Sequence, residues 1–323
     1  MPRFSFTPDA SFPVCHGEKG VLELECSFDF SGTELSEFVS GVASNAVPSD
    51  AYAVLKADCD TVKEKLKERL DSDSFAECKV SCYGNWCKLE ARGIAGHAAF
   101  PEGAVSAEVK LAEILKKSGI LSGKAQKFVE AVSLLFADYY GAGLDIPYED
   151  GVSGKLTHVG GMVRMKEGKA IQNINIRYPV TTDRGLMVDT VKKRLTDLGF
   201  TVEMVSDNPP CYVDRDTPEI KILTDICNKY LEMDLKPYVM GGGTYARKLK
   251  NAVGYGPGIP FVASRFGSGR GNGHQPDECM SIEILKKAVC IYAEAVKALD
   301  ELVEWAERMN ISGCSMQSRG FAF

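Results

Sequence analysis

The chain has 323 residues, of which 45% are hydrophobic and 25% charged, and its formal net charge is −6 at pH 7. These values are typical of a globular protein and leave room for two domains of ordinary size. The negative charge argues against a nucleic-acid-binding protein, which would normally present a basic face. No apolar run approaches the roughly 18 residues of a membrane span, and the N-terminus lacks the basic-then-apolar pattern of a signal peptide.

Eleven cysteines are scattered along the chain without a C-x-x-C pair. Cys78, Cys82 and Cys87 form a loose cluster, but no second cluster follows that would complete a zinc site. This pattern favours reduced thiols in a cytoplasmic protein.

The first third of the chain mixes turns, strands and helices. Thr7-Pro8-Asp9 has the composition of a turn, on which the Asp9 carboxylate is either a metal ligand or an acceptor within the turn. Alternating apolar and polar residues over 21–30 predict a half-buried strand. The segment 41–55, which contains Asn45, is expected to be a loop. Further along we expect a helix at 60–70, two strands within 76–94, the segment GIAGHAAFPEG around His97, and a helix at 104–117.

A similar series of elements follows before residue 206. The expected elements are helices at 124–140 and 186–198 and strands at 156–165, 170–180 and 201–205. The order strand, helix, strand, strand, helix therefore occurs once and, roughly, again. The sequence identity between the two passes is too low to establish a repeat.

The character of the chain changes at Asn208-Pro209-Pro210. Beyond it we expect a helix at 218–231, a strand at 236–240, the glycine turn GGGTYARKL, a strand at 252–255 and a long helix at 281–309. The long helix has an apolar stripe with a period near 3.6, which predicts packing on a sheet; it consists of Ile282, Leu285, Val289, Tyr292, Val296, Leu299 and Val303. The tail at 306–323 is expected to be disordered.

The segment GSGRGNGHQPDE has a glycine at every second position from Gly267 to Gly273, followed by His274. Such a run weakens both helices and strands and predicts a loop. An imidazole on a loop suits a metal ligand or a proton-transfer group, although a solvated histidine is the simpler alternative.

Six segments in order resemble the dinuclear zinc dipeptidases of the PepV type, whose superfamily also holds carnosinases, aminoacylases and zinc carboxypeptidases. The segments are FTPDASFPV…EKG, SNAVP, GHAAFPEG, NINIRYP, GGGTYAR and GHQPDE, spread over residues 4–300. The resemblance implies an α/β fold: a catalytic domain with a mixed sheet and helices, into which a large α+β lid domain of two similar halves is inserted. It assigns residues 23–206 to the lid, and 1–22 with 207–305 to a partial catalytic domain.

The resemblance also implies roles for individual residues. Asp9 resembles a carboxylate ligand of one zinc ion and His274 a histidine ligand of the other, although cobalt or manganese could occupy similar ligands. His97 and Asn45 resemble the lid residues that reach the scissile carbonyl of the substrate. Arg177 resembles the arginine that binds the substrate carboxylate, with Arg184 as a weaker rival. The turn that lies against the substrate backbone is matched by Gly242, Gly243 and Thr244.

Each of these residues has a simpler structural explanation when taken alone. His97 could be a hydrogen-bonded histidine at a strand end, and Arg177 a solvated residue on a strand. His16 and His158 are given no functional role. The chemistry nevertheless suits the assignment, because a developing oxyanion needs donors and a guanidinium matches a carboxylate with two parallel N–H groups.

Two motifs of the resembled family are missing from the 323 residues: His-x-Asp, which gives a zinc ligand and a bridging aspartate, and an adjacent pair of glutamates, which gives the general base and a ligand. The resemblance therefore implies the C-terminal portion of a metallo-dipeptidase, inactive alone, whose dipeptide-hydrolysing site is completed by a missing N-terminal half. The alternative is a non-catalytic binding or complementing module. No nucleic-acid or membrane partner is expected.

Overall fold

The computed structural model describes residues 2–71, 78–260, 266, 271 and 277–314. Its contacts divide the chain into two compact units. The inserted unit is residues 19–210, and the terminal unit combines residues 1–18 with 211–323. Among the described residues, no helix is both long and apolar enough to cross a membrane.

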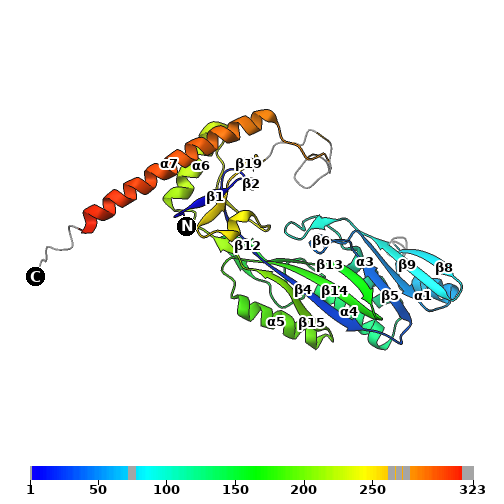
Figure 1. Ribbon diagram of the computed structural model, residues 1–323. Coiled ribbons are helices and arrows are strands. Elements are labelled where there is room, and N and C mark those ends of the chain that lie inside the picture. Colours follow the sequence, from blue (N-terminus) through cyan, green and yellow to red (C-terminus); the bar gives the residue numbers. More distant parts are fainter. Residues whose placement is uncertain (1, 72–77, 261–265, 267–270, 272–276, 315–323) are drawn as a thin grey trace, which may run out of the picture. The chain divides into compact units, whose positions relative to one another are not determined.

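One antiparallel sheet of eight strands forms the framework of the inserted unit, in the order β15-β4-β14-β13-β5-β7-β9-β8 (Figure 1). Its strands are β4 (Gly20–Asp29), β5 (Leu35–Ser40), β7 (Asp50–Leu55), β8 (Cys78–Tyr83), β9 (Trp86–Arg92), β13 (Thr157–Lys166), β14 (Lys169–Tyr178) and β15 (Thr201–Asn208). Two short ladders lie outside it: β6 (Ala46–Val47) with β10 (Gly96–His97), and β11 (Glu149–Asp150) with β12 (Gly154–Lys155).

Four helices pack against one face of this sheet. They are α1 (Cys59–Arg69), α3 (Ala107–Ser118), α4 (Gly123–Leu135) and α5 (Arg184–Asp197). Three begin at predictable caps, because the side chains of Asp58, Ser106 and Asp183 each accept a hydrogen bond from the backbone N–H three residues on. The predicted helices are thus confirmed, with shifted ends.

Alternation along β4 shows why the sheet has one apolar and one polar face. Leu22 and Leu24 are fully buried in the core that the helices share, whereas Glu23 and Glu25 are half-buried on the opposite face. Successive side chains of a strand point to opposite faces, so the alternation places the polar face opposite the helices. The predicted strand at 21–30 is confirmed.

The predicted loop at 41–55 is wrong in its second half, which contains β6 and β7. Ala51, Ala53 and Leu55 of β7 are buried at alternate positions, and the strand pairs with both β5 and β9. Pro48 lies just before β7, so it does not interrupt the hydrogen bonds of the strand.

Helix α4 ends at Leu135, earlier than the predicted residue 140. The Asp138 carboxylate accepts backbone hydrogen bonds from Tyr140 (2.5 Å) and Gly143 (3.3 Å), and the carbonyl of Tyr139 accepts from the backbone N–H of His158 (2.8 Å). Local capture of backbone N–H groups by an aspartate stabilises a turn in place of a further helical turn.

The terminal unit contains a smaller mixed sheet in the order β1-β18-β3-β16, with β17 also paired to β3. Its strands are β1 (Ser5–Thr7), β3 (Cys15–Glu18), β16 (Cys211–Tyr212), β17 (Tyr238–Met240) and β18 (Ala252–Gly254), beside the pair β2 (Ala10–Ser11) and β19 (Pro257–Gly258). Helices α6 (Pro218–Leu231) and α7 (Ile282–Cys314) share its core, in which Phe12 and Tyr255 meet edge to face. The 3₁₀ helix η1 (Tyr245–Lys248) follows the glycine turn.

Two expectations about α7 are wrong. Of the predicted apolar stripe, Ile282, Leu285, Val289 and Val296 are exposed, and only Tyr292 and Leu299 among the described side chains pack against the core. The buried side of the helix is formed by Ala288, Ile291 and Ala295. The helix also continues to Cys314, beyond its predicted end at 309, so residues 310–314 are helical although they were expected only in a disordered tail. The sequence has no proline in this stretch and no glycine before Gly313, so no residue with a low helix propensity ends the helix earlier.

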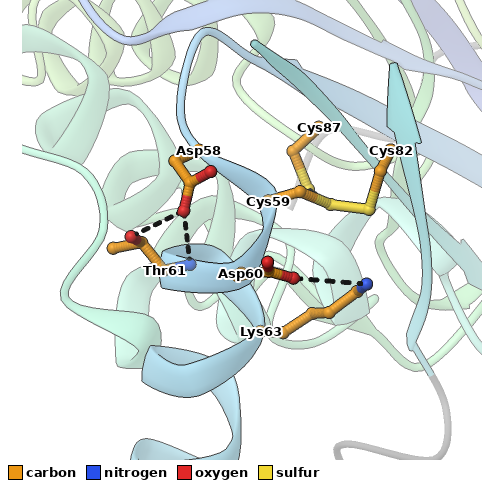
Figure 2. Close-up of a disulfide and its surroundings, with 7 residues drawn as sticks. All are labelled: Asp58, Cys59, Asp60, Thr61, Lys63, Cys82 and Cys87. Atoms are coloured by element: carbon orange, nitrogen blue, oxygen red, sulfur yellow. Dashed lines mark hydrogen bonds and ion pairs between the residues drawn. A yellow bond between two sulfur atoms is a disulfide. The ribbon is translucent and has the colours of Figure 1, made fainter. Parts of the chain in front are cut away.

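The expectation of reduced thiols is wrong for one pair of cysteines. Figure 2 shows a disulfide between Cys59, at the start of α1, and Cys82 of β8. The buried Cys87 lies beside them, with its Sγ 3.5 Å from the Sγ of Cys59. The spacing of the cysteines in the sequence does not predict this pairing. Cys59 and Cys82 are 23 positions apart and meet only because α1 packs on the β8–β9 hairpin.

Reducing this disulfide is expected to lower the free energy of unfolding by about 3 kcal/mol, because a cross-link over a sequence separation of 23 restricts the unfolded chain. Urea unfolding with and without dithiothreitol measures the difference. A Cys59→Ser, Cys82→Ser double variant is the control and should not respond to the reductant. An equal response of the variant and the unsubstituted chain would contradict the pairing.

Candidate active site

Asn45 and His97 are brought together by the ladder of β6 and β10. His97 pairs with Ala46 across this ladder, and the backbone N–H of Ala98 donates to the carbonyl of Asn45 (2.9 Å). The Asn45 Nδ2 lies 3.5 Å from the His97 Nε2, and both side chains are exposed. Two polar groups 52 residues apart in the sequence therefore present donors at one place on the inserted unit.

The surroundings of His97 define which of its nitrogens can donate. The backbone N–H of Ala99 donates to Nδ1 (3.1 Å), so Nδ1 is an acceptor and the neutral ring carries its proton on Nε2. Nε2 faces the Asn45 Nδ2, which can only donate, so with the proton on Nε2 this contact of 3.5 Å joins two donors and is not a hydrogen bond. The Nε2–H group is therefore suited to donate to a ligand oxygen.

Arg177 lies on β14 and is only 8% exposed, which excludes the alternative of a solvated surface arginine. Its Nε donates to the Oδ1 of Asn175 (2.7 Å). The rival Arg184 instead forms an ion pair with Asp207, which also accepts a hydrogen bond from the hydroxyl of Tyr178 (3.1 Å). Engagement with a carboxylate of its own unit makes Arg184 the poorer ligand for a substrate carboxylate.

In the terminal unit the glycine turn is organised by Glu18, a residue that the sequence analysis missed. The Glu18 side chain is 1% exposed and accepts from the backbone N–H (3.0 Å) and hydroxyl (2.5 Å) of Thr244. Its Oε2 accepts from the Nε of Arg247 (2.7 Å), whose Nη2 donates to the carbonyl of Gly242 (3.2 Å). A Cβ at Gly243 would lie 2.8 Å from this guanidinium, so a larger residue there would displace the Arg247 side chain from its present position.

Asp9 lies next to this turn. Its Oδ2 accepts from the backbone N–H of Tyr245 (3.2 Å), the residue that follows Thr244. The other predicted metal ligand, His274, is outside the described residues. The two histidines without an assigned role are buried: His16 hydrogen bonds to the carbonyl of Val213 (2.8 Å) and His158 to that of Leu135 (3.0 Å). Burial lowers the pKa of His158.

The residues that the structure describes do not form a zinc site by themselves. Over residues 2–71, 78–260, 266, 271 and 277–314, no three His, Cys, Asp or Glu side chains are grouped so that they could hold a metal ion. Asp9 contributes a single carboxylate, and catalytic zinc usually has three protein ligands. The zinc ions implied by the resemblance therefore stay a prediction.

Comparison with known proteins places these residues in a family. The chain is 32% identical over 309 residues to YtjP of Bacillus subtilis (strain 168), provisionally named a dipeptidase, and 29% identical over 310 residues to a protein of Staphylococcus epidermidis that is named in the same way. Each alignment covers 93% of this chain but 64% of the relative, so the chain spans less than two thirds of their length.

Among solved structures, human carnosine dipeptidase 1 matches over 90% of this chain and 58% of its own, with 8% identity and a TM-score of 0.42. The aminoacylhistidine dipeptidase of Vibrio alginolyticus matches over 80% of this chain and 60% of its own, with 15% identity and a TM-score of 0.40. The sequence profile of peptidase family M20/M25/M40 matches residues 7–298. This chain therefore belongs to peptidase family M20/M25/M40.

Proposed function

We propose that this chain provides the substrate-binding part of a metallo-dipeptidase. The observation that carries the proposal is the arrangement in the inserted unit: exposed donors from Asn45 and His97 beside each other, and a buried arginine, Arg177, on the same unit. A dipeptide has a peptide carbonyl, which needs hydrogen-bond donors, and a terminal carboxylate, which a guanidinium binds through two parallel N–H groups.

The inserted unit is proposed to act as the lid, and its sheet order supports two similar halves. On one side of the β13–β5 junction the order is β5-β7-β9-β8, and on the other β13-β14-β4-β15. Helix α1 connects β7 to β8, and α5 connects β14 to β15, so the order strand, strand, helix, strand occurs in both halves. The remaining strand differs: β9 follows β8 directly, whereas β4 comes before both halves in the chain. The unit bounded at 19–210 differs by four residues at each end from the predicted lid at 23–206.

The metal site is proposed to be completed by a polypeptide that carries the His-x-Asp and Glu-Glu motifs. Neither motif occurs in the 323 residues, and the described residues group no three metal ligands. Zinc in such a site supplies an activated water; this chain would contribute Asp9, His274 and the substrate-binding residues. The same observations favour a second candidate, a binding module without hydrolytic activity. A cytoplasmic location is proposed with both.

Metal content and hydrolysis of alanyl-alanine, measured for the chain alone and after mixing with that polypeptide, distinguish the two candidates. Metal uptake and turnover only in the mixture would support the dipeptidase. Binding of alanyl-alanine with neither metal uptake nor turnover in the mixture would support the binding module. Turnover by the chain alone would contradict its proposed dependence on a completing polypeptide.

Arg177→Lys is expected to raise the dissociation constant of alanyl-alanine about 10- to 100-fold, because an ammonium group cannot form two parallel bonds to a carboxylate. Calorimetric titration of the full chain measures this. Alanyl-alanine amide, which lacks the carboxylate, should bind both proteins equally. Arg164→Lys, on the exposed part of neighbouring β13, is the matched control. Equal weakening of both ligands would contradict carboxylate binding by Arg177.

A further inference from the structure

We propose that Glu23 is a positioning residue that holds Arg177 and Asn45 in their binding orientations, an inference that rests on the proposed function. Glu23 lies on the polar face of β4. Its Oε1 accepts two hydrogen bonds, from the Nδ2 of Asn175 (2.7 Å) and from the hydroxyl of Ser44 (3.0 Å). One carboxylate oxygen thereby joins residues that are 131 positions apart in the sequence (44 and 175).

The first branch runs from Glu23 to Arg177. Asn175 is fully buried, donates through Nδ2 to Glu23 and accepts through Oδ1 from the Nε of Arg177 (2.7 Å). Because the Glu23 carboxylate can only accept, the Nδ2 end of the Asn175 amide must face it. The Oδ1 of the same amide is therefore directed at the guanidinium of Arg177. Such chains of buried hydrogen bonds strengthen one another. Removing the Glu23 acceptor would allow the Asn175 amide to rotate, and the Nε of Arg177 would then lose the acceptor that is directed at it.

The second branch runs from Glu23 to the segment that carries Asn45. Ser44 directly precedes Asn45, and its backbone is packed closely on β13, since a Cβ at Gly161 would lie 2.2 Å from the carbonyl oxygen of Ser44. The hydrogen bond from the Ser44 hydroxyl adds a side-chain restraint to this backbone contact. Two contacts therefore restrain the segment 44–45: the backbone of Ser44 packs on β13, and the hydroxyl of Ser44 donates to Glu23.

Through these two branches Glu23 connects Arg177, which would bind the terminal carboxylate, with Asn45, which would reach the scissile carbonyl. In a dipeptide these two points are a short, constant distance apart, so a shared anchor would favour a single spacing. Holding binding groups in place before the ligand arrives reduces the entropy lost on binding. The neighbouring Glu25 on the same face instead pairs with Arg164, outside both branches.

Glu23→Ala is expected to raise the dissociation constant of alanyl-alanine about tenfold in calorimetric titrations of the full chain, because two partly buried hydrogen bonds to a charged group are lost. Glu23→Gln should restore binding to within about threefold, since its amide oxygen can accept both bonds. The matched control Glu25→Ala should change the constant less than about twofold. Nuclear magnetic resonance of the Arg177 Nε–Hε group should show faster hydrogen exchange in Glu23→Ala only.

Two outcomes separate failure of this inference from failure of the proposed function. If the unsubstituted chain binds alanyl-alanine and Glu23→Ala binds it equally well, Glu23 does not position the binding groups. If Glu23→Gln is as weak as Glu23→Ala while Arg177 exchange is unchanged in both, the hydrogen-bond branches are also contradicted. If the unsubstituted chain does not bind alanyl-alanine, the proposed function itself fails, whatever the exchange of Arg177 shows.

Discussion

Glu108→Gln is expected to stabilise the inserted unit by about 3 kcal/mol at pH 7, since each pKa unit corresponds to about 1.4 kcal/mol. Glu108 lies on α3 and is fully buried, and its Oε2 accepts from the hydroxyl of Ser40 (2.7 Å). Burial raises the pKa of this carboxyl from 4.5 to about 8. Because the folded-state pKa is the higher one, the folded protein keeps a proton that the unfolded chain loses.

The sign of the pH dependence follows from this difference. The contribution of Glu108 to stability is fully present below pH 4.5 and is lost progressively as the pH rises to about 8, where the loss reaches about 5 kcal/mol. Glutamine has no proton to lose, so the variant should lack this decline. Urea unfolding at pH 5, 7 and 9, monitored by amide hydrogen exchange within residues 19–210, gives both curves.

Glu113→Gln is the control on the same helix. Glu113 is partly exposed and its pKa is lowered by the hydrogen bond and charge of Lys116, against the effect of burial. Its replacement should change stability little and in the opposite direction. If the unfolding free energies of Glu108→Gln and the unsubstituted chain decline in parallel from pH 5 to 9, Glu108 is ionised in the folded protein.

Glu18→Ala is expected to destabilise the terminal unit by about 3–5 kcal/mol, because it leaves the guanidinium of Arg247 buried without its charge partner. It also removes the acceptor for the backbone N–H and hydroxyl of Thr244. The Arg247 side chain is 11% exposed, so water can replace the carboxylate only in part. Urea unfolding monitored by hydrogen exchange of α6 and β18 measures the loss.

A double variant separates the charge effect from the loss of contacts. Arg247→Met in the Glu18→Ala background removes the unpaired charge and should recover at least half of the lost stability, since a buried pair can often be replaced by apolar groups at little cost. Strict additivity of the two single substitutions would show that Glu18 and Arg247 are not coupled in the folded protein.

Local patterns in the sequence were sufficient for most of the regular structure. Alternation identified β4, and the helix predicted at 60–70 lies within one residue of α1 at both ends. These features depend on neighbours within a few residues, so one sequence contains the information. The predicted loop at 41–55 failed for β7, because pairing with β5 and β9 outweighed the turn-forming residues before it.

The residues of the candidate site likewise fall into those that local segments identify and those whose partners are distant in the sequence. Segment resemblance identified Asn45, His97 and Arg177, and membership of peptidase family M20/M25/M40 is confirmed. Their roles, and those of Asp9, Gly242, Gly243 and Thr244, stay predictions, and His274 lies outside the described residues. Glu18 lies in the EKG segment that carries the resemblance, but the sequence analysis gave neither Glu18 nor Glu23 a role, because their partners are 226 and 152 positions away in the sequence.

The amino-acid sequence by itself determined which segments form most of the helices and strands and to which peptidase family the chain belongs, because periodicity and short motifs are properties of neighbouring residues. Only the tertiary structure decided the Cys59–Cys82 disulfide, the buried acid at Glu108 and the hydrogen bonds that orient Arg177 and Thr244. Each of these features depends on which side chains, distant in the sequence, come into contact and on how far they are shielded from water. Only the folding of the whole chain determines these contacts and this burial.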